Sequence, residues 1–201
     1  MTTFLEIIGF GLLGYLFGSL SFALWITRLV KGVDVREGGS GHATATNTMR
    51  TAGWGAFVVV LILDIGKGYI PVWMSAYFSD SNWLVGLVAM LVVVGHCWPI
   101  FSEFKGGMGL ATAGGTILAI SPIAFLLGVG ILIALTLILH HSARAAVVLG
   151  ASLPLIFWGI GWRGELIWAT LGIGIVISIR FFSDWNRQYR ELWLDRENKN
   201  F

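Results

Sequence analysis

The fold is decided by residues 54–78, which read WGAFVVVLILDIGKGYIPVWMSAYF. Asp64 and Lys67 are the only charged residues in this run. A helix needs about 20 apolar residues to cross the hydrocarbon core of a bilayer, so the run predicts a membrane-spanning helix. The whole chain agrees, since 56% of its 201 residues are hydrophobic and 12% are charged. Soluble domains carry roughly 25% charged residues, so the composition excludes an ordinary soluble fold.

Further apolar segments lie on both sides of this run. Residues 109–139 are too long for one span, and Ser121-Pro122 divides them, because proline ends or kinks a helix. The other segments are residues 4–27, 83–101, 145–160 and 165–182. The sequence therefore predicts an all-α membrane helix bundle with about seven transmembrane helices, the fourth of them short. We expect a single membrane-embedded domain over residues 1–201.

Basic residues mark one face of this bundle. With seven spans, eleven of the thirteen Lys and Arg residues fall on the side of the C-terminus, Arg163 falls on the other side, and Lys67 lies within a span. The eleven are Arg28, Lys31, Arg36, Arg50, Lys105, Arg144, Arg180, Arg187, Arg190, Arg196 and Lys199. Cytoplasmic loops are enriched in Lys and Arg, so the N-terminus is predicted outside and the C-terminus in the cytoplasm. The cytoplasmic motif loops then lie near residues 31–52, 102–110 and 180–201.

The first of these loops contains the sequence GGSGHATATNTMR at residues 38–50. Glycines let successive backbone N–H groups turn toward an anion. Hydroxyl groups, an amide and an arginine fork suit phosphate oxygens. The candidate phosphate ligands are Ser40, Thr44, Thr46, Thr48, Asn47 and Arg50. A solvated linker is the alternative, but such a density of small hydroxyl residues favours phosphate binding.

The second loop lies within GHCWPIFSEFKGGMGLAT at residues 95–112. His96 is expected at the inner end of the third span, and Lys105 with Gly106 and Gly107 forms a basic turn. A helix that begins near Gly109 would offer unpaired N–H groups to an anion. The spacing is not that of a Walker A loop, and taken alone the segment fits a plain turn between helices as well.

Other polar features allow simpler interpretations. Asp64 and Lys67 share a helix face and are expected to neutralise each other, in a structural or a functional pair. Residues 180–196 favour a surface helix at anionic lipid. Adjacent His140 and His141 do not face one ligand, so no metal site is predicted, and the single Cys97 excludes an internal disulfide.

These motifs together resemble the small bacterial membrane acyltransferases that use acyl phosphate to acylate glycerol 3-phosphate. The first loop, preceded by Val33-Asp34-Val35-Arg36, is similar to the family's DIR-x-x-GSGN-x-GATN-x-x-R motif. Residues 63–68, LDIGKG, look like its LD-x-x-KG segment, and residues 95–112 look like GH-x-FP-x-F-x-x-FKGGKG-x-AT. Gly18-Ser19 and Ala23 look like its first-span segment, with Ser21 where proline is usual. The order and spacing hold over nearly the whole chain.

The resemblance implies transfer of an acyl group from acyl phosphate to the sn-1 hydroxyl of glycerol 3-phosphate in the bacterial inner membrane. It implies no cofactor and no nucleic acid, contact with membrane lipid, and allows a monomer. The implied catalytic residues are His96, Ser40 and Arg50. His96 is the best candidate among the side chains for a general base, and a substrate phosphate is the alternative. The implied phosphate-binding residues are Ser40, Gly41, Thr46, Asn47, Arg50, Lys105, Gly106, Gly107 and Asn186.

The sequence departs from the family pattern at several of these places. His42 stands where the family has Asn, Thr44 replaces a glycine, and Met108 replaces the second Lys of FKGGKG. The third motif, HREN-like, keeps only Asn186, and Ser183 stands in place of its His. The alternative is therefore a divergent member that binds lipid phosphates with little or no turnover. A small transporter is a third class, which the lack of a visible inverted repeat disfavours.

Overall fold

The computed structural model describes residues 3–187, and in this range the regular structure is helical throughout. The helices before the second motif loop are α1 (Phe4–Gly18), α2 (Phe22–Lys31), η1 (Val35–Glu37), α3 (Ala45–Ala52), α4 (Trp54–Phe78) and α5 (Asn82–Cys97). They are followed by η2 (Ile100–Ser102), α6 (Leu110–Ile120), α7 (Pro122–Leu139), α8 (Ser142–Gly159) and α9 (Glu165–Phe182). The predicted all-α membrane bundle is confirmed.

Six segments of the described chain are long and apolar enough to cross a bilayer. They are Phe4–Lys31, Trp54–Phe78, Asn82–Ser102, Pro122–Leu139, Ser142–Gly159 and Glu165–Phe182. The seventh predicted segment is α6, which has 11 residues. At about 1.5 Å per residue it covers roughly half of a ~30 Å hydrocarbon core. The division at Ser121-Pro122 is confirmed, because α6 ends at Ile120 and Pro122 is the first residue of α7.

The first predicted span, residues 4–27, is not one continuous helix. It breaks between α1 and α2, where Ser19, Leu20 and Ser21 leave the helix. The buried Lys67 of α4 donates from Nζ to the Leu20 carbonyl oxygen over 2.6 Å. The same ammonium lies 2.8 Å from Asp64 Oδ1. Lys67 therefore has a structural role, because it pairs with Asp64 and also binds the backbone of the first span. The break leaves the Leu20 carbonyl without a hydrogen-bond donor from its own helix, and the Lys67 ammonium of α4 supplies one.

Small residues bring the central helices close together. A Cβ at Gly68 of α4 would overlap the Thr112 carbonyl of α6, and a Cβ at Gly115 of α6 would overlap the Ile65 carbonyl of α4. Gly150 and Gly174 make the corresponding contact between α8 and α9. Close packing through small residues is the usual basis of helix association in membranes.

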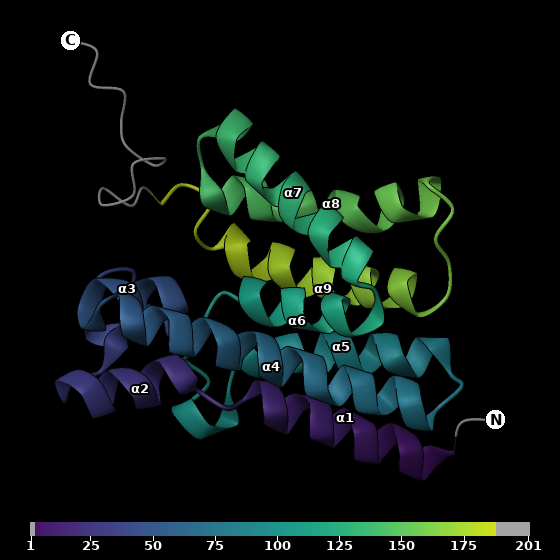
Figure 1. Cartoon of the computed structure of the whole chain (residues 1–201), viewed down its shortest axis with the longest axis horizontal. Coiled ribbons are helices and arrows are strands. Elements are labelled where there is room, and N and C mark those ends of the chain that lie inside the picture. Colours follow the sequence, from purple (N-terminus) through teal and green to yellow (C-terminus); the bar gives the residue numbers. More distant parts are fainter. Residues whose placement is uncertain (1–2, 188–201) are drawn as a thin grey trace.

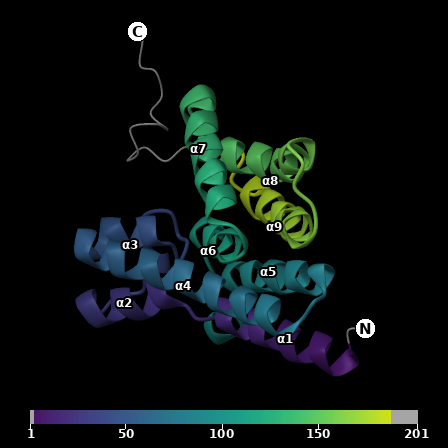
Figure 2. The ribbon, with the colours of Figure 1, turned by 45° about the vertical axis from the view of Figure 1, so that its right-hand side comes forward.

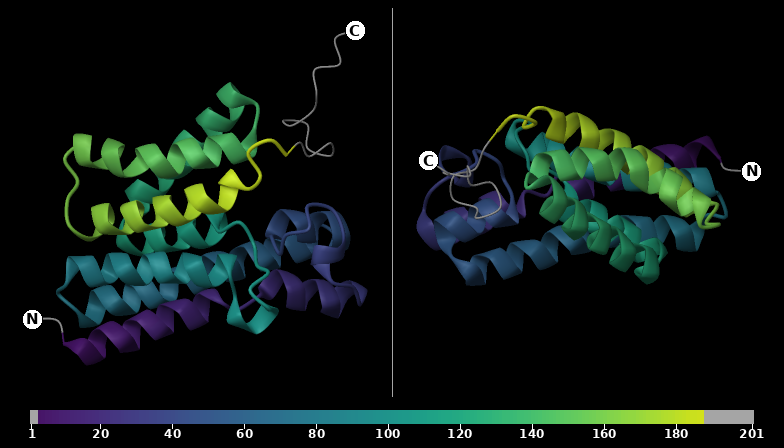
Figure 3. Two further views of the ribbon diagram at one scale, coloured as in Figure 1. Left: turned by 180° about the vertical axis from the view of Figure 1, so that it is seen from behind. Right: turned by 90° about the horizontal axis from the view of Figure 1, so that it is seen from above.

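The motif loops gather at one end of the bundle (Figure 1). The beginning of α1 lies at the opposite end from α2, α3 and the end of α9, and the view from behind agrees (Figure 3). Helix α7 leans away from the α4–α5 layer and packs mainly on α8 and α6 (Figure 2). The fold therefore places segments from residues 32–53, 98–109, 140–142 and 183–187 at the same end of the bundle.

Candidate functional site

A cavity of about 550 Å³, here called the main cavity, opens between α3, α4, α6, α7 and the ends of α8 and α9. Its polar wall consists of Ser40, His42, Thr44, Thr46, Arg50, Asp64, His96, Ser142 and Asp184. Its apolar wall consists of Phe57, Leu61 and Ile65 of α4, Leu110 of α6, and Phe125 and Val129 of α7. The volume lies in the range of small-molecule sites, and the two walls suit a ligand with one polar and one apolar end.

A second cavity of about 420 Å³, here called the mouth cavity, lies at the same end of the bundle. It is lined by Asp34, Arg36, Glu37, Gly41, His42, Phe104, Lys105, Gly106 and Arg180. Three of these residues are cations, and Lys105 is the most accessible of them, with 72% of its side chain exposed. Arg36 is paired with Asp34, so Lys105 and Arg180 are the cations that make this cavity suitable for an anion that enters from water.

Asn47 fixes the shape of the first motif loop. Its buried side-chain amide donates to the carbonyl oxygens of Val35, Gly38 and His42 over 2.6, 3.0 and 3.1 Å. Its Oδ1 accepts from the backbone N–H of Ser40 over 3.0 Å. Both ends of the amide thus contact the loop backbone, and Asn47 is not among the residues that line either cavity. We therefore assign it a positioning role in place of the predicted contact with phosphate.

Asp34 and Arg36 join the first motif loop to the second. The two side chains form a bidentate ion pair, with distances of 2.7–3.2 Å, and Arg36 also donates to the Ser102 carbonyl oxygen over 3.1 Å. The hydrogen bonds from Arg36 outweigh burial and lower the pKa of Asp34 to about 2. The carboxylate therefore stays ionised at neutral pH.

The glycines of the second motif loop are required mainly by packing. A Cβ at Gly107 would overlap the His96 ring and the Ala43 carbonyl, and a Cβ at Gly106 would overlap the His96 carbonyl. Arg180 Nε donates to the Gly107 carbonyl oxygen over 2.9 Å. The end of α9 is thereby attached to this loop.

His96 lies on the polar wall of the main cavity, as expected for the inner end of the third span. Its Nδ1 is 3.1 Å from Thr112 Oγ1 and 3.7 Å from Asp64 Oδ1. The ring therefore sits between α4, α5 and α6, in reach of a ligand in the cavity.

The structure brings most of the predicted site residues together. Ser40, Thr46, Arg50 and His96 line the main cavity, and Gly41, Lys105 and Gly106 line the mouth cavity. Gly107 lies beside them, at a small cavity that it shares with Gly106, Lys67 and His96.

Asn186 is the exception among the described site residues. It is exposed and lines none of these cavities, whereas Asp184, two residues before it, is buried and lines the main cavity. Residues 188–196 of the predicted surface helix, and residues 188–201 of the predicted third loop, lie outside the described residues.

Two residues missed by the sequence analysis belong to the site. Arg180 and Asp184 flank the end of α9, four residues apart, and both contact His42. In the sequence, only their position at the polar C-terminal end of the last apolar segment could have indicated that they belong to the site. Their partner lies more than 130 residues away, so spacing alone did not connect them.

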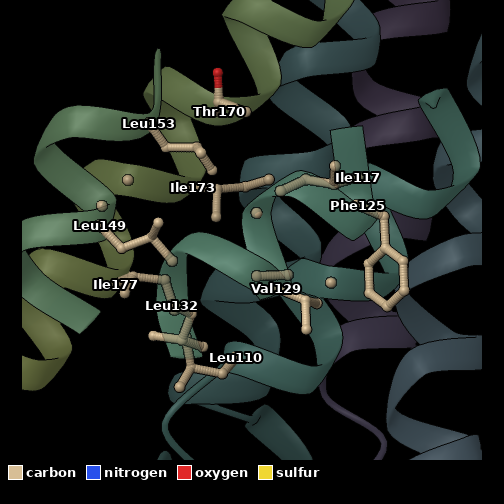
Figure 4. A pocket seen from close by; sticks show the side chains of 15 residues that line it. Leu110, Ile117, Phe125, Val129, Leu132, Leu149, Leu153, Thr170, Ile173 and Ile177 are labelled. Atoms are coloured by element: carbon tan, nitrogen blue, oxygen red, sulfur yellow. The ribbon is translucent and has the colours of Figure 1, made fainter. Parts of the chain in front are cut away.

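A small apolar cavity adjoins the main cavity behind α6 and α7 (Figure 4). Its volume is about 70 Å³. Leu110, Gly114, Phe125 and Val129 line both cavities. The apolar wall thus continues toward Ile173 and Leu153, between α8 and α9.

Comparison with known proteins agrees with this geometry. The family model described as glycerol-3-phosphate acyltransferase matches residues 8–191. The chain is 36% identical to glycerol-3-phosphate acyltransferases of Klebsiella pneumoniae subsp. pneumoniae and Salmonella paratyphi B, over 95% of this chain and 94–95% of theirs.

Two solved structures are also similar. They are the glycerol 3-phosphate form and the lysophosphatidic acid form of the integral membrane acyltransferase PlsY (YgiH), with TM-scores of 0.80 and 0.79. Their sequence identities are 32% and 31%, and the match covers 90% of this chain and of each of theirs. The chain is a multi-pass membrane protein and belongs to the glycerol-3-phosphate acyltransferase family.

Proposed function

We propose that this enzyme transfers an acyl group from an acyl phosphate to the sn-1 hydroxyl of glycerol 3-phosphate. The products are lysophosphatidic acid and inorganic phosphate. The observation that carries the proposal is the main cavity itself, in which a polar wall with Arg50 faces an apolar wall of membrane helices. The donor has the same two-part character, an anionic head and an apolar chain.

The donor is placed in the main cavity. Arg50, Ser40 and Thr46 lie on the polar wall, where their donors suit phosphate oxygens. The acyl chain then lies along Leu61, Phe125 and the rest of the apolar wall, where burial contributes about 0.8 kcal/mol per methylene. The acyl carbonyl comes to the boundary between the two walls.

The acceptor is placed in the mouth cavity. Lys105 and Arg180 supply positive charge for its phosphate, and the backbone of Gly41 and Gly106 lines the same space. The two substrate phosphates repel each other, so cations on both sides of the boundary are needed to hold them close.

Acyl phosphate is already activated, so transfer needs no covalent enzyme intermediate. The protein has to orient the hydroxyl, stabilise the charge that develops on the carbonyl oxygen and accept a proton. His96 lies on the polar wall within reach of that carbonyl, and Thr112 fixes its ring. Because Nδ1 is occupied by Thr112, we assign His96 a hydrogen-bonding role there in place of the general base expected from the sequence.

The motif end of the bundle is assigned to the cytoplasm, where glycerol 3-phosphate would enter from water. The basic residues support this orientation, because they gather at the motif loops. The location that follows is the bacterial inner membrane, with the start of α1 outside.

One observation favours a second candidate function. Met108, which replaces a family lysine, is buried on the wall of the main cavity and leaves that wall one cation short. A member that binds lipid phosphates without turnover would tolerate this loss.

Product formation separates the two candidates. Detergent-purified protein is incubated with palmitoyl phosphate and radiolabelled glycerol 3-phosphate, and lysophosphatidic acid is measured. We expect product that requires both substrates. Folded protein that binds palmitoyl phosphate but forms no product would support the second candidate and refute acyl transfer.

A further inference from the structure

The small apolar cavity continues the main cavity into the middle of the bundle. The two cavities share the lining residues Leu110, Gly114, Phe125 and Val129, and α8 and α9 enclose the space beyond them (Figure 4). The Phe125 ring narrows the passage between the cavities. Gly114 lies opposite this ring, where an added Cβ would be 3.1 Å from Phe125 Cε2, so the lack of a side chain there leaves the passage open.

The lining of the small apolar cavity selects an apolar occupant. Among the described residues that line it, Thr170 is the one with a polar side chain, and its hydroxyl donates to the Leu166 carbonyl oxygen of its own helix over 2.8 Å. This hydroxyl therefore needs no partner from a ligand. Apolar cavities of this kind stay free of water and bind apolar groups, so a piece of hydrocarbon chain fits the space and a phosphate does not.

Close helix packing fixes the walls on α6, α8 and α9. A Cβ at Gly150 of α8 would lie 2.8 Å from the Gly174 carbonyl oxygen of α9, and a Cβ at Gly115 of α6 would overlap the Ile65 carbonyl of α4. The remaining wall is α7, which contributes the buried Gly128. A Cβ at Gly128 would lie 3.9 Å from Leu153 Cδ2, an ordinary contact, so the missing side chain at Gly128 keeps this space open.

The depth of the small apolar cavity matches the end of an acyl chain. Its lining residues on α6 run from Leu110, at the motif end, to Ile117, about 10 Å along the helix. On α9, Thr170 lies about 18 Å from Phe182 at the motif end. A chain whose head group stays at the membrane surface reaches about halfway through a hydrocarbon core of ~30 Å. Its terminal carbons thus lie at the depth of this cavity.

We propose that the small apolar cavity holds the terminal carbons of the acyl phosphate chain, and that Gly128 determines the longest chain that is used efficiently. This assignment rests on the proposed function. A methylene group occupies about as much space as a water molecule, roughly 30 Å³, so a cavity of about 70 Å³ takes about two of them. Donors long enough to reach the cavity gain this burial, and shorter donors do not.

Gly128→Leu fills the cavity from α7 and tests the assignment. The measurement is kcat/KM for stearoyl, palmitoyl and lauroyl phosphate with glycerol 3-phosphate as acceptor. Each buried methylene changes affinity roughly fourfold, so the ratio for stearoyl over lauroyl phosphate should fall roughly tenfold. Gly128→Ala adds a single carbon that fits beside Leu153 and should lower the ratio by a smaller factor, about fourfold or less.

The same helix supplies a matched control. At Gly130, two residues further along α7, an added Cβ would meet no atom within 4 Å. Gly130→Leu therefore adds the same side chain and the same helix propensity on the exposed side of α7. The ratio for stearoyl over lauroyl phosphate should stay at the wild-type value in this protein.

A second substitution across the cavity separates chain binding from damage to the fold. Leu153→Ala enlarges the cavity opposite Gly128, so this single variant should raise the ratio. In Gly128→Leu/Leu153→Ala, the volume added on one side replaces the volume removed on the other. The ratio should therefore return toward the wild-type value, which a misfolded protein would not show.

Three results would overturn the assignment. A Gly128→Leu protein that unfolds at a higher temperature but keeps the wild-type ratio would identify the cavity as a packing void outside the path of the donor. An equal loss of activity with all three donors would show that the space holds a separate membrane lipid or only supports the fold. Wild-type protein that forms no lysophosphatidic acid with any donor would refute acyl transfer itself, and this assignment with it.

Discussion

The polar wall and the apolar wall of the main cavity are built in different ways. The polar wall is held by hydrogen bonds: Asn47, behind the wall, fixes the backbone of the first motif loop, and His42 pairs with Asp184 from the distant end of α9. The apolar wall is completed by α7, whose most apolar 18-residue stretch is only 11% buried within the protein. The corresponding share in the α5 segment is 61%.

The difference reflects what each wall has to bind. A phosphate is recognised by donors in fixed directions, so their supports must be fixed as well. An acyl chain is bound by exclusion from water, which has no direction and scales with area. We therefore expect polar-wall substitutions to affect turnover strongly and apolar-wall substitutions to change chain preference mildly.

The largest effect is expected from Asn47→Ala. The substitution removes the donor from the buried carbonyl of Val35 and from the more accessible carbonyls of Gly38 and His42, and an unsatisfied buried group costs roughly 1–3 kcal/mol. Activity should fall to background, and the thermal unfolding temperature should drop. Asn47→Asp keeps the acceptor for the Ser40 N–H but places a carboxylate oxygen against the same carbonyl groups, so it should lose stability as well. Equal stability of all three proteins would contradict the positioning role.

Arg50→Ala should be next. Loss of a charge-assisted contact with the donor phosphate is expected to cost about 2–3 kcal/mol, or roughly 30- to 150-fold in kcat/KM. Arg50→Lys keeps the charge without the fork and should lie between Ala and wild type. The measurement is kcat/KM for palmitoyl phosphate. An Arg50→Ala variant as active as wild type would place the donor phosphate elsewhere.

Met108→Lys tests whether the polar wall lacks a cation. A lysine at this buried position would face the main cavity, and we expect roughly a tenfold gain in kcat/KM for acyl phosphate. Met108→Leu preserves volume and should change little. A loss of activity in the lysine variant, with the fold intact, would show that the methionine is required.

Phe125→Ala should give the smallest effect. Phe125 lines both the main cavity and the small apolar cavity behind it, so its removal should join the two (Figure 4). Each additional methylene buried there contributes about 0.8 kcal/mol, roughly fourfold in affinity. The ratio of kcat/KM for stearoyl over lauroyl phosphate should rise about fourfold, as expected if one more methylene of the longer chain is buried. Leu126→Ala, on the exposed side of α7, is the control and should leave the ratio unchanged.

The sequence predicted the features that depend on local composition. The spans follow from runs of apolar residues, and the division at Ser121-Pro122 follows from the chemistry of proline. The two motif loops were recognised because their polar residues are contiguous. Ser40, Thr46, Arg50 and His96 accordingly lie on the main cavity as expected.

The features that were missed depend on contacts between distant segments. The break of the first span is satisfied by Lys67, 47 residues after Leu20, and nothing near Leu20 indicates it. Asn47 has the residue type of a phosphate ligand, but its amide faces the loop backbone. Asn186 matches the residue type of the family motif but does not line the main cavity, whereas Asp184, which the motif does not indicate, does line it.

The most direct test is a crystal structure of the protein with a non-hydrolysable acyl phosphonate bound. We expect the phosphonate to contact Arg50 and Ser40 and the chain to lie against Leu61 and Phe125 on the apolar wall. A head group bound outside the main cavity, or a chain that leaves it between other helices, would refute this placement of the donor.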